Sequence, residues 1–217
     1  MQDNQAENRV VQKFPERIVY LNELLKKPEF CLSEINLKCN LELPTEFQLG
    51  INVKNCDEKN PRKSLDSKQP FIPSNKNVTE AFKIIKPNIQ QLIEDTNALK
   101  MWVSLLIPKI EDGNNFGVFI QEGTLVQILQ VENEATSYLK HATQYYAARG
   151  KLITKVVKYP YVEDYKLAID ELDKKTYVSI AIVMHDIRNH YTTLYDIVIK
   201  NIDKIKKPRS SNTTSFY

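Results

Sequence analysis

Apolar residues recur at three- and four-residue steps over most of the chain, which is the spacing that lines one face of an α-helix. A first run lies within "AENRVVQKFPERIVYLNELLKK" and stops before Pro28, with Pro15 marking a start or a kink. A second run covers residues 78–106, where Pro87 should bend the helix early. The pattern therefore predicts two helices in the first half of the chain.

The second half of the chain predicts two longer helices. One carries an apolar stripe from Leu125 to Val156 and is ended by Pro160, and the other covers residues 162–206 and stops before Pro208. At 1.5 Å per residue, the last helix is a rod of about 65 Å. Four helices predict an all-α fold class. Because the connections between the last three helices are short, we expect an elongated antiparallel four-helix bundle.

The loss of periodicity divides the chain. Residues 1–38 hold the first helix, and residues 39–77 carry four prolines and mixed charges that are typical of a flexible linker. Residues 78–208 hold the other three helices with a connecting loop at 108–117, and residues 209–217 form a tail without helical spacing.

Composition excludes several classes of protein. The chain of 217 residues is 42% hydrophobic and 26% charged, and its net charge of +3 calls for neither a nucleic acid nor a membrane as partner. Three cysteines, Cys31, Cys39 and Cys56, are too few and too widely spaced for a disulfide framework or a zinc site.

The last two helices carry apolar residues outside their main stripes, and a single bundle would leave some of them wet. This excess favours self-association through the long flanks. The residues concerned are Val131, Ala181, Ile182, Val183, Ile197 and Ile199.

The motif "MHDIRNH" contains candidate catalytic or metal-binding residues, His185, Asp186 and His190. Two histidines that share a metal on a helix stand four residues apart, whereas these stand five apart and diverge around the axis. No phosphate loop, nucleophile elbow or other active-site motif accompanies them. We therefore expect no enzyme activity, no metal site and no cofactor.

The stretch "KMWVSLLIPKIEDGNNFGVFIQEG" concentrates three of the five glycines of the chain. Its Asp112-Gly113 and Asn114-Asn115 pairs suit turns and left-handed backbone conformations, and its glycines would let the backbone approach another surface closely. One interpretation is a decorated turn with a buried Phe116. The other is a rigid loop that is shaped to press on a partner.

"LKMWVSLLIPKIEDGNNFGVFIQE" resembles the activation-loop segment of the REG (11S) proteasome activators, and "YPYVEDYKLAIDELDKKTYVS" and "LYDIVIKNIDKIKKPRSSN" resemble their last helix and its exit. The resemblance implies a homoheptameric ring with a central pore that sits on the 20S proteasome core particle. Its tails would dock on the α-subunit ring and its loops would open the gate, stimulating ATP-independent peptide hydrolysis without catalysis by this chain.

The resemblance also implies the site residues. Asn114 stands at the position most tied to gate opening, and the tail end would enter pockets between core subunits. The activation loop comprises Ile110, Glu111, Asp112, Gly113, Asn114, Asn115, Phe116 and Gly117, and the docking tail comprises Ser215, Phe216 and Tyr217.

"KKPRSSN" and "RGKLITKVVKYP" are more similar to the gamma subtype of this family, which implies the nucleus, with the cytoplasm as the alternative. Two other functions stay open. One is a helical scaffold or adaptor that binds folded protein partners through the same loop, and the other is an enzyme that uses His185 and Asp186.

Overall fold

The structure is a computed structural model that describes residues 7–30, 72–109 and 113–209. The three cysteines and most of the predicted linker lie outside these ranges. The described elements are the π-helical segment η1 (Arg9–Lys13) and the helices α2 (Phe14–Leu25), α4 (Lys76–Leu106), α5 (Phe116–Lys158) and α6 (Glu163–Lys206). None of the described helices is both long enough and apolar enough to cross a membrane.

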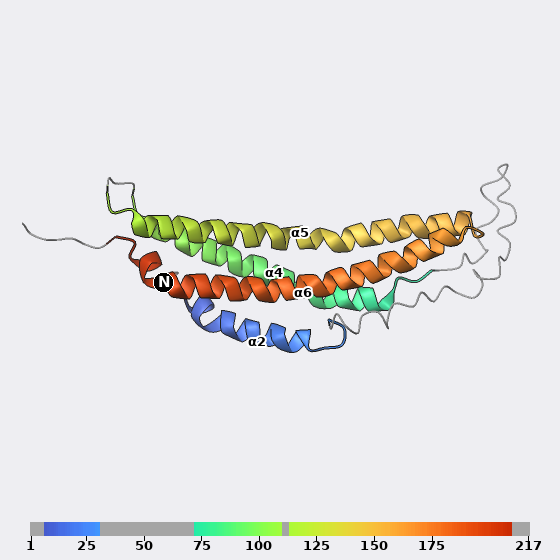
Figure 1. Cartoon of the computed structure of the whole chain (residues 1–217), viewed down its shortest axis with the longest axis horizontal. Helices are drawn as coiled ribbons and strands as arrows, with labels where there is room; N and C mark the ends of the chain where they lie inside the picture. The colour runs from blue at the N-terminus through green and yellow to red at the C-terminus, as the bar shows by residue number, and fades with distance from the viewer. Residues whose placement is uncertain (1–6, 31–71, 110–112, 210–217) are drawn as a thin grey trace, which may run out of the picture.

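The helices form an elongated bundle, as the apolar spacing predicts. Helices α4, α5 and α6 alternate in direction along the rod, and the shorter α2 lies against α6 (Figure 1). The described part of the chain contains only helices and their connections, so the expected all-α class is confirmed.

Helix α6 packs against all the other helices, and η1 and α2 are held to the bundle by apolar and polar contacts together. The Phe14 ring meets the Tyr191 ring edge-on, with 5.0 Å between centroids. The Tyr191 hydroxyl donates to Asp95 Oδ2 at 2.8 Å, and Arg9 pairs with Asp95 Oδ1 at 3.1 Å. One buried carboxylate on α4 therefore ties α6 and η1 together.

Capping explains the start of α4, which comes two residues before the predicted 78. Asn75 is the N-cap, and its Oδ1 accepts from the amides of Asn77 and Val78 at 3.0 and 3.3 Å. The helix also continues through Pro87, where the Asn88 side chain donates to the Ile84 carbonyl at 2.7 Å. The bond lies in the turn that precedes the proline, where the missing N–H of Pro87 removes the usual donor of the Lys83 carbonyl.

Helix α5 begins at Phe116, so Phe116 and Gly117, which the sequence assigns to the end of the loop at 108–117, form its first turn. Gly117 and Gly123 both lie inside the helix. Each glycine weakens a helix by about 1 kcal/mol relative to alanine, which is too little to end a helix that packs along its whole length. The connection between α4 and α5, residues 107–115, is therefore close to the expected loop at 108–117.

The excess of apolar residues is also smaller than the sequence indicates. Val131, Ala181 and Val183 are buried within this chain, while Ile182 stays 47% exposed and Ile197 and Ile199 are half-buried. Packing of α6 against several neighbours at once widens its buried face beyond one stripe.

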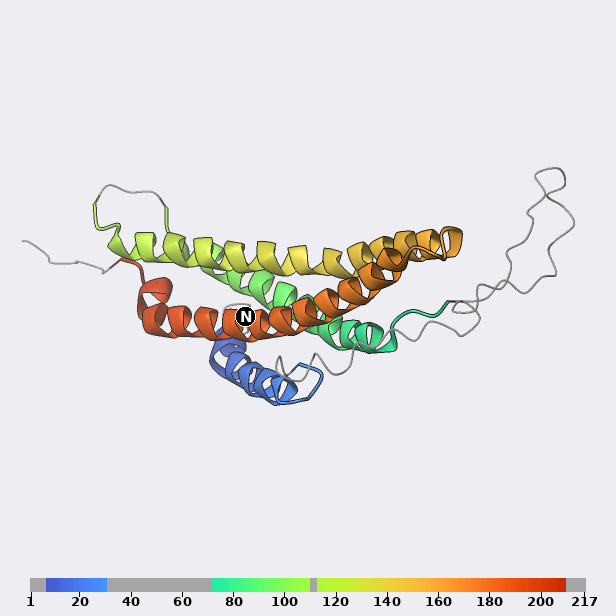
Figure 2. The same cartoon turned by 45° about the vertical axis from the view of Figure 1, so that its right-hand side comes forward.

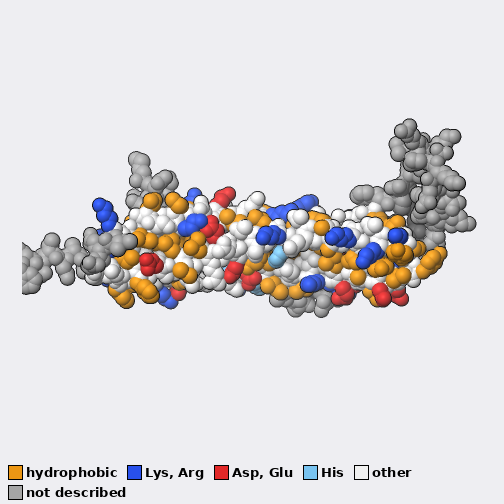
Figure 3. Space-filling view, turned by 90° about the horizontal axis from the view of Figure 1, so that it is seen from above, with side chains coloured by type: hydrophobic (Ala, Val, Ile, Leu, Met, Phe, Trp, Pro, Cys, Tyr) orange, Lys and Arg blue, Asp and Glu red, His pale blue; other side chains and the backbone are white. Residues whose placement is uncertain are grey.

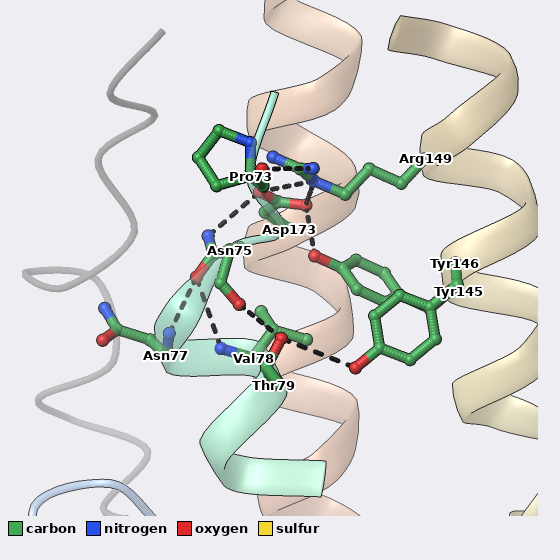
Figure 4. Close-up of polar contacts among 9 residues, drawn as sticks. All are labelled: Pro73, Asn75, Asn77, Val78, Thr79, Tyr145, Tyr146, Arg149 and Asp173. Carbon is green, nitrogen blue, oxygen red and sulfur yellow. Dashed lines mark hydrogen bonds and ion pairs between the residues drawn. The ribbon is translucent and has the colours of Figure 1, made fainter. Parts of the chain in front are cut away.

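A buried polar cluster joins three helices where the chain enters α4 (Figure 4). Asp173 on α6 accepts from Arg149 Nε at 3.1 Å, from the Tyr145 hydroxyl at 2.9 Å and from Asn75 Nδ2 at 2.9 Å. Arg149 NH1 also donates to the Pro73 carbonyl at 3.2 Å. The cluster thus fixes the entrance of α4 against both α5 and α6.

Of the histidine motif, His190 and Asp186 take part in contacts between α5 and α6. His190 Nε2 lies 3.2 Å from Glu134 Oε2 and 3.5 Å from the Tyr138 hydroxyl, which donates to Asp186 at 3.4 Å. Burial lowers the pKa of His190 below 6.5, against the opposing effect of Glu134 and Asp186. The neutral ring can donate Nε2–H to Glu134, so the motif serves packing, and the described residues bring together no group of ligands that could hold a metal.

We predict that Asp173→Ala lowers the free energy of unfolding by about 3–5 kcal/mol, because it leaves the Arg149 guanidinium buried without its carboxylate. Asp196→Ala is the matched control, since it removes an exposed partner of Lys200 and should cost about 0.5 kcal/mol. Urea unfolding of both variants at one fixed protein concentration measures the difference. Equal losses would show that the buried cluster contributes no more than a surface pair.

We also predict that stability falls as the pH drops below 6.5. The unfolded chain then takes up a proton that the folded His190, with its lower pKa, does not yet bind, so unfolding is favoured until the folded pKa is passed. His190→Gln should remove this component, which is at most about 1.4 kcal/mol per pH unit. Urea unfolding between pH 7.5 and 5 tests it, and an unchanged pH dependence in the variant would contradict it.

Candidate functional site

Three helix ends meet at one end of the rod, the loop-bearing end. Helix α4 finishes there at Leu106, α5 starts at Phe116, and α6 finishes at Lys206 (Figures 1 and 2). The loop between α4 and α5 and the exit of the C-terminal segment therefore lie side by side. The loop and the tail are far apart in the sequence, and the fold brings the start of α5 and the end of α6 together.

The structure describes part of the predicted loop and only the first residue of the C-terminal segment 209–217. Five loop residues are described, and the last described residue of the tail is Arg209. The predicted site residues outside the described ranges are Ile110, Glu111 and Asp112 in the loop and Ser215, Phe216 and Tyr217 in the tail.

The second half of the loop adopts left-handed backbone conformations. Gly113 has a φ of 82° and Asn114 a φ of 42°. Glycine has no Cβ to clash in this region, and asparagine tolerates it better than most residues. The expectation that these residue pairs suit left-handed positions is confirmed for Gly113 and Asn114.

Asn115 is the N-cap residue of α5, but its side chain makes no cap hydrogen bond to the first turn. Its Oδ1 accepts from Arg209 NH2 at 3.0 Å, across 94 positions of sequence. Asparagine is among the best N-cap residues. Here its side chain instead joins the loop to the exit from α6, a contact that no short sequence motif reveals.

Gly117 is required by a close approach rather than by its φ. A Cβ at this position would lie 2.5 Å from the Cα of Pro208 and closer still to the Pro208 carbonyl oxygen. The expectation that a glycine allows close backbone approach is thus met by the chain itself. Gly123, by contrast, faces open space.

Gln121 lies one turn further along α5 and is fully buried. Its Nε2 donates to the Leu106 carbonyl at 2.9 Å and to the Ile205 carbonyl at 2.7 Å. These are free carbonyls at the ends of α4 and α6, which a helix cannot satisfy by itself. The only sequence signal for this residue is its position, three or four residues from Gly117 and Thr124 on the helix face that also holds Ile128.

Two aromatic side chains stand out from the same end. Phe116 is 68% exposed and Phe119 is 73% exposed. The interpretation of a turn with a buried Phe116 is therefore wrong. Rings exposed to this extent gain nothing in solvent and are available to another surface.

Positive charge gathers where α6 ends. Lys206 pairs with Glu7 at 2.9 Å, and Lys207 follows as an exposed side chain at the C-cap. Cations at this position complement the partial negative charge of the helix C-terminus. Lys206 and Lys207 thus have a structural reason to be there, whatever partner the end meets.

Comparison with known proteins assigns the chain to a family. The family model for proteasome activator PA28, C-terminal, matches residues 71–215, and the one for PA28, N-terminal, matches residues 3–45. Proteasome activator complex subunit 3 of Gallus gallus is 41% identical over 231 residues, covering 99% of this chain and 91% of the relative.

Two solved structures have the same fold. The 11S subunit of the Plasmodium falciparum proteasome, PA28, is 33% identical with a TM-score of 0.74, covering 96% of this chain and 89% of the relative. An activator solved as a proteasome–11S activator complex has a TM-score of 0.70 at 10% identity, covering 98% of this chain and 91% of that one, which bears on the fold alone. By both family models and by its identity to subunit 3, this chain belongs to the PA28 (REG, 11S) family of proteasome activators and is gamma-like within it.

Proposed function

We propose that this chain is a non-catalytic activator of the 20S proteasome core particle. Seven copies would form a ring with a central pore, the C-terminal tails would dock on the α-subunit ring, and the activation loops would open the gate to peptides. The observation that carries the proposal is the common location of loop base and tail exit at one end of a PA28-family bundle.

The energy for such a function comes from binding. A ligand shifts a closed-to-open equilibrium only by its preference for the open state, so the loop must contact the gate in that state. One tail of a few residues binds weakly, but a ring presents several at once, which raises avidity by roughly 10²–10⁴ per linked site. Tails that dock and loops that act therefore have separate tasks.

An exposed apolar face on α5 supports the ring. Phe119, Val126 and Leu129 are 73%, 61% and 42% exposed. Helical spacing places Phe119 and Val126 opposite the buried face that holds Gln121 and Ile128, and Leu129 lies at the side of that buried face. Figure 3 shows hydrophobic side chains over this loop-bearing half of the molecule. A heterologous contact that closes a ring would need a second apolar surface, and exposed Met101 and Leu105 on α4 provide one.

The family assignment favours the activator over a scaffold or adaptor, and the contacts of His190 account for its motif without catalysis. The gamma-like identity supports placement in the nucleus. Residues 1–38, 39–77, 78–208 and 209–217 would then act as first helix, linker, main bundle with loop, and docking tail.

We predict that Val126→Glu breaks the ring, because the interface would bury an unpaired carboxylate. The parent should sediment at several times 25.2 kDa, while the variant should need at least about tenfold more protein to assemble. Gln144→Glu is the control, since it places a carboxylate on the same line of α5, five turns further along. A parent that sediments at 25.2 kDa at micromolar concentration would contradict the ring.

We predict that loop and tail variants fail differently. Deletion of Ser215–Tyr217 should leave folding and ring size unchanged but abolish co-sedimentation with the core particle. Asn114→Tyr places a bulky residue at a φ of 42° and should retain docking but lose stimulation of short-peptide hydrolysis.

The two measurements also test the alternatives. If the truncated ring co-sediments at normal affinity, the tail is not the docking element. If Asn114→Tyr stimulates as well as the parent, the loop is only a turn. A scaffold or adaptor that binds its partners without the tail would tolerate the deletion of Ser215–Tyr217.

A further inference from the structure

We infer that Arg209 is a positioning residue of the activation loop: from the exit of the tail it holds Asn115, and so holds the loop in its working conformation. The inference rests on the proposed function for its effect on the core particle. The contact itself is a property of the free chain.

The first argument is the use of Asn115. An N-cap asparagine normally accepts from its own first turn, which contributes stability to that helix. Here Oδ1 accepts from Arg209 NH2 at 3.0 Å and makes no cap bond. The side chain thus makes a contact that spans 94 positions of sequence and links the last loop residue to the exit from α6.

The second argument is that Arg209 itself stands on a fixed base. Its neighbour Pro208 lies against Gly117 so closely that no Cβ would fit between them. One turn earlier on α6, the Ile205 carbonyl accepts from buried Gln121. Two contacts thus hold the exit from α6 against the first two turns of α5, and a guanidinium that leaves this base reaches Asn115 from a defined direction.

The third argument is that the other side of the loop is tied to the same base. Gln121 also holds the end of α4, because its Nε2 donates to the Leu106 carbonyl at 2.9 Å. The end of α4, where the loop starts, is thus linked through Gln121 to the end of α6, and the last loop residue, Asn115, is bonded to Arg209 directly. Between these ends, Gly113 and Asn114 have left-handed backbone conformations, a small region of φ/ψ space that limits how the loop can be arranged.

These contacts make the tail base and the loop base one unit. When the tail docks, the loop would take a fixed position relative to it, and the Arg209–Asn115 bond would hold residues 113–115 of the loop in place. Loss of the bond should release residues 113–115 without releasing the tail. Docking and gate opening would then separate in one variant.

The test compares Arg209→Ala with Lys207→Ala, which removes one positive charge from the same exit but is an exposed side chain outside the loop contact. Stimulated peptide hydrolysis is measured against activator concentration. Arg209→Ala should lower the maximal stimulated rate about fivefold while the concentration for half-maximal stimulation changes less than about twofold. Lys207→Ala should leave both values at the parent level.

A thermodynamic cycle identifies the partner. Asn115→Ala should lower the maximal rate by a similar factor, and the double variant should be no worse than either single variant, because both remove the same bond. If the two losses multiply, Arg209 does not act through Asn115 and the inference is overturned.

Amide hydrogen exchange of the free ring gives a readout that needs no core particle. Arg209→Ala should speed exchange at residues 113–119 and leave the exchange of α4 and the thermal midpoint unchanged, whereas Lys207→Ala should change none of them. If exchange is unchanged, or if Arg209→Ala raises only the half-maximal concentration, Arg209 is a docking contact and no positioning residue. If the parent itself gives no stimulation, the proposed function fails. The exchange result still decides whether Arg209 holds the loop through Asn115.

Discussion

The register of three long helices is the constraint on which the loop-bearing end depends. Apolar stripes alone allow neighbouring helices to slide by a turn, about 5.4 Å, with contacts of the same kind. Buried polar groups do not allow this, because an unpaired one is costly. Asp173 with Arg149 sets the register near one end, and Gln121 sets it at the other. A slip of one turn would part the Gln121 amide from both carbonyls.

Helical spacing predicted the all-α bundle and the ends of α5 and α6, because Pro160 and Pro208 stop helices for local steric reasons. The start of α5 differs from the expected end of the loop, Gly117, by two residues, because the helix begins at Phe116 and includes that glycine. Packing of α5 outweighs the cost of about 1 kcal/mol per glycine. Val131 was also expected to lie outside the buried stripe. It is buried, because burial depends on which helices surround a residue and not on spacing alone.

The loop motif could be recognised in the sequence, but the contacts that hold it could not. Asn115 and Arg209 are far apart in the chain, as are Gln121 and Ile205, and each residue has ordinary local neighbours. Only the antiparallel return of α6 beside the start of α5 brings them together. Gly117 shows the same difficulty: its sequence position indicates a turn, whereas the structure shows a helix that presses on another part of the backbone.

Holding the loop in advance changes what docking has to supply. Ordering one residue costs about 1–2 kcal/mol, and a loop ordered only on contact would draw that cost from the binding of the tail. In this chain Gln121 bonds the ends of α4 and α6, and Asn115 is bonded to Arg209 at the exit from α6, before any partner arrives. Under the proposed function, the free energy of tail binding is then available for displacing the gate. Under that function, the contacts of Gln121, Gly117 and Arg209 would hold the loop in the shape that it presents to the core particle.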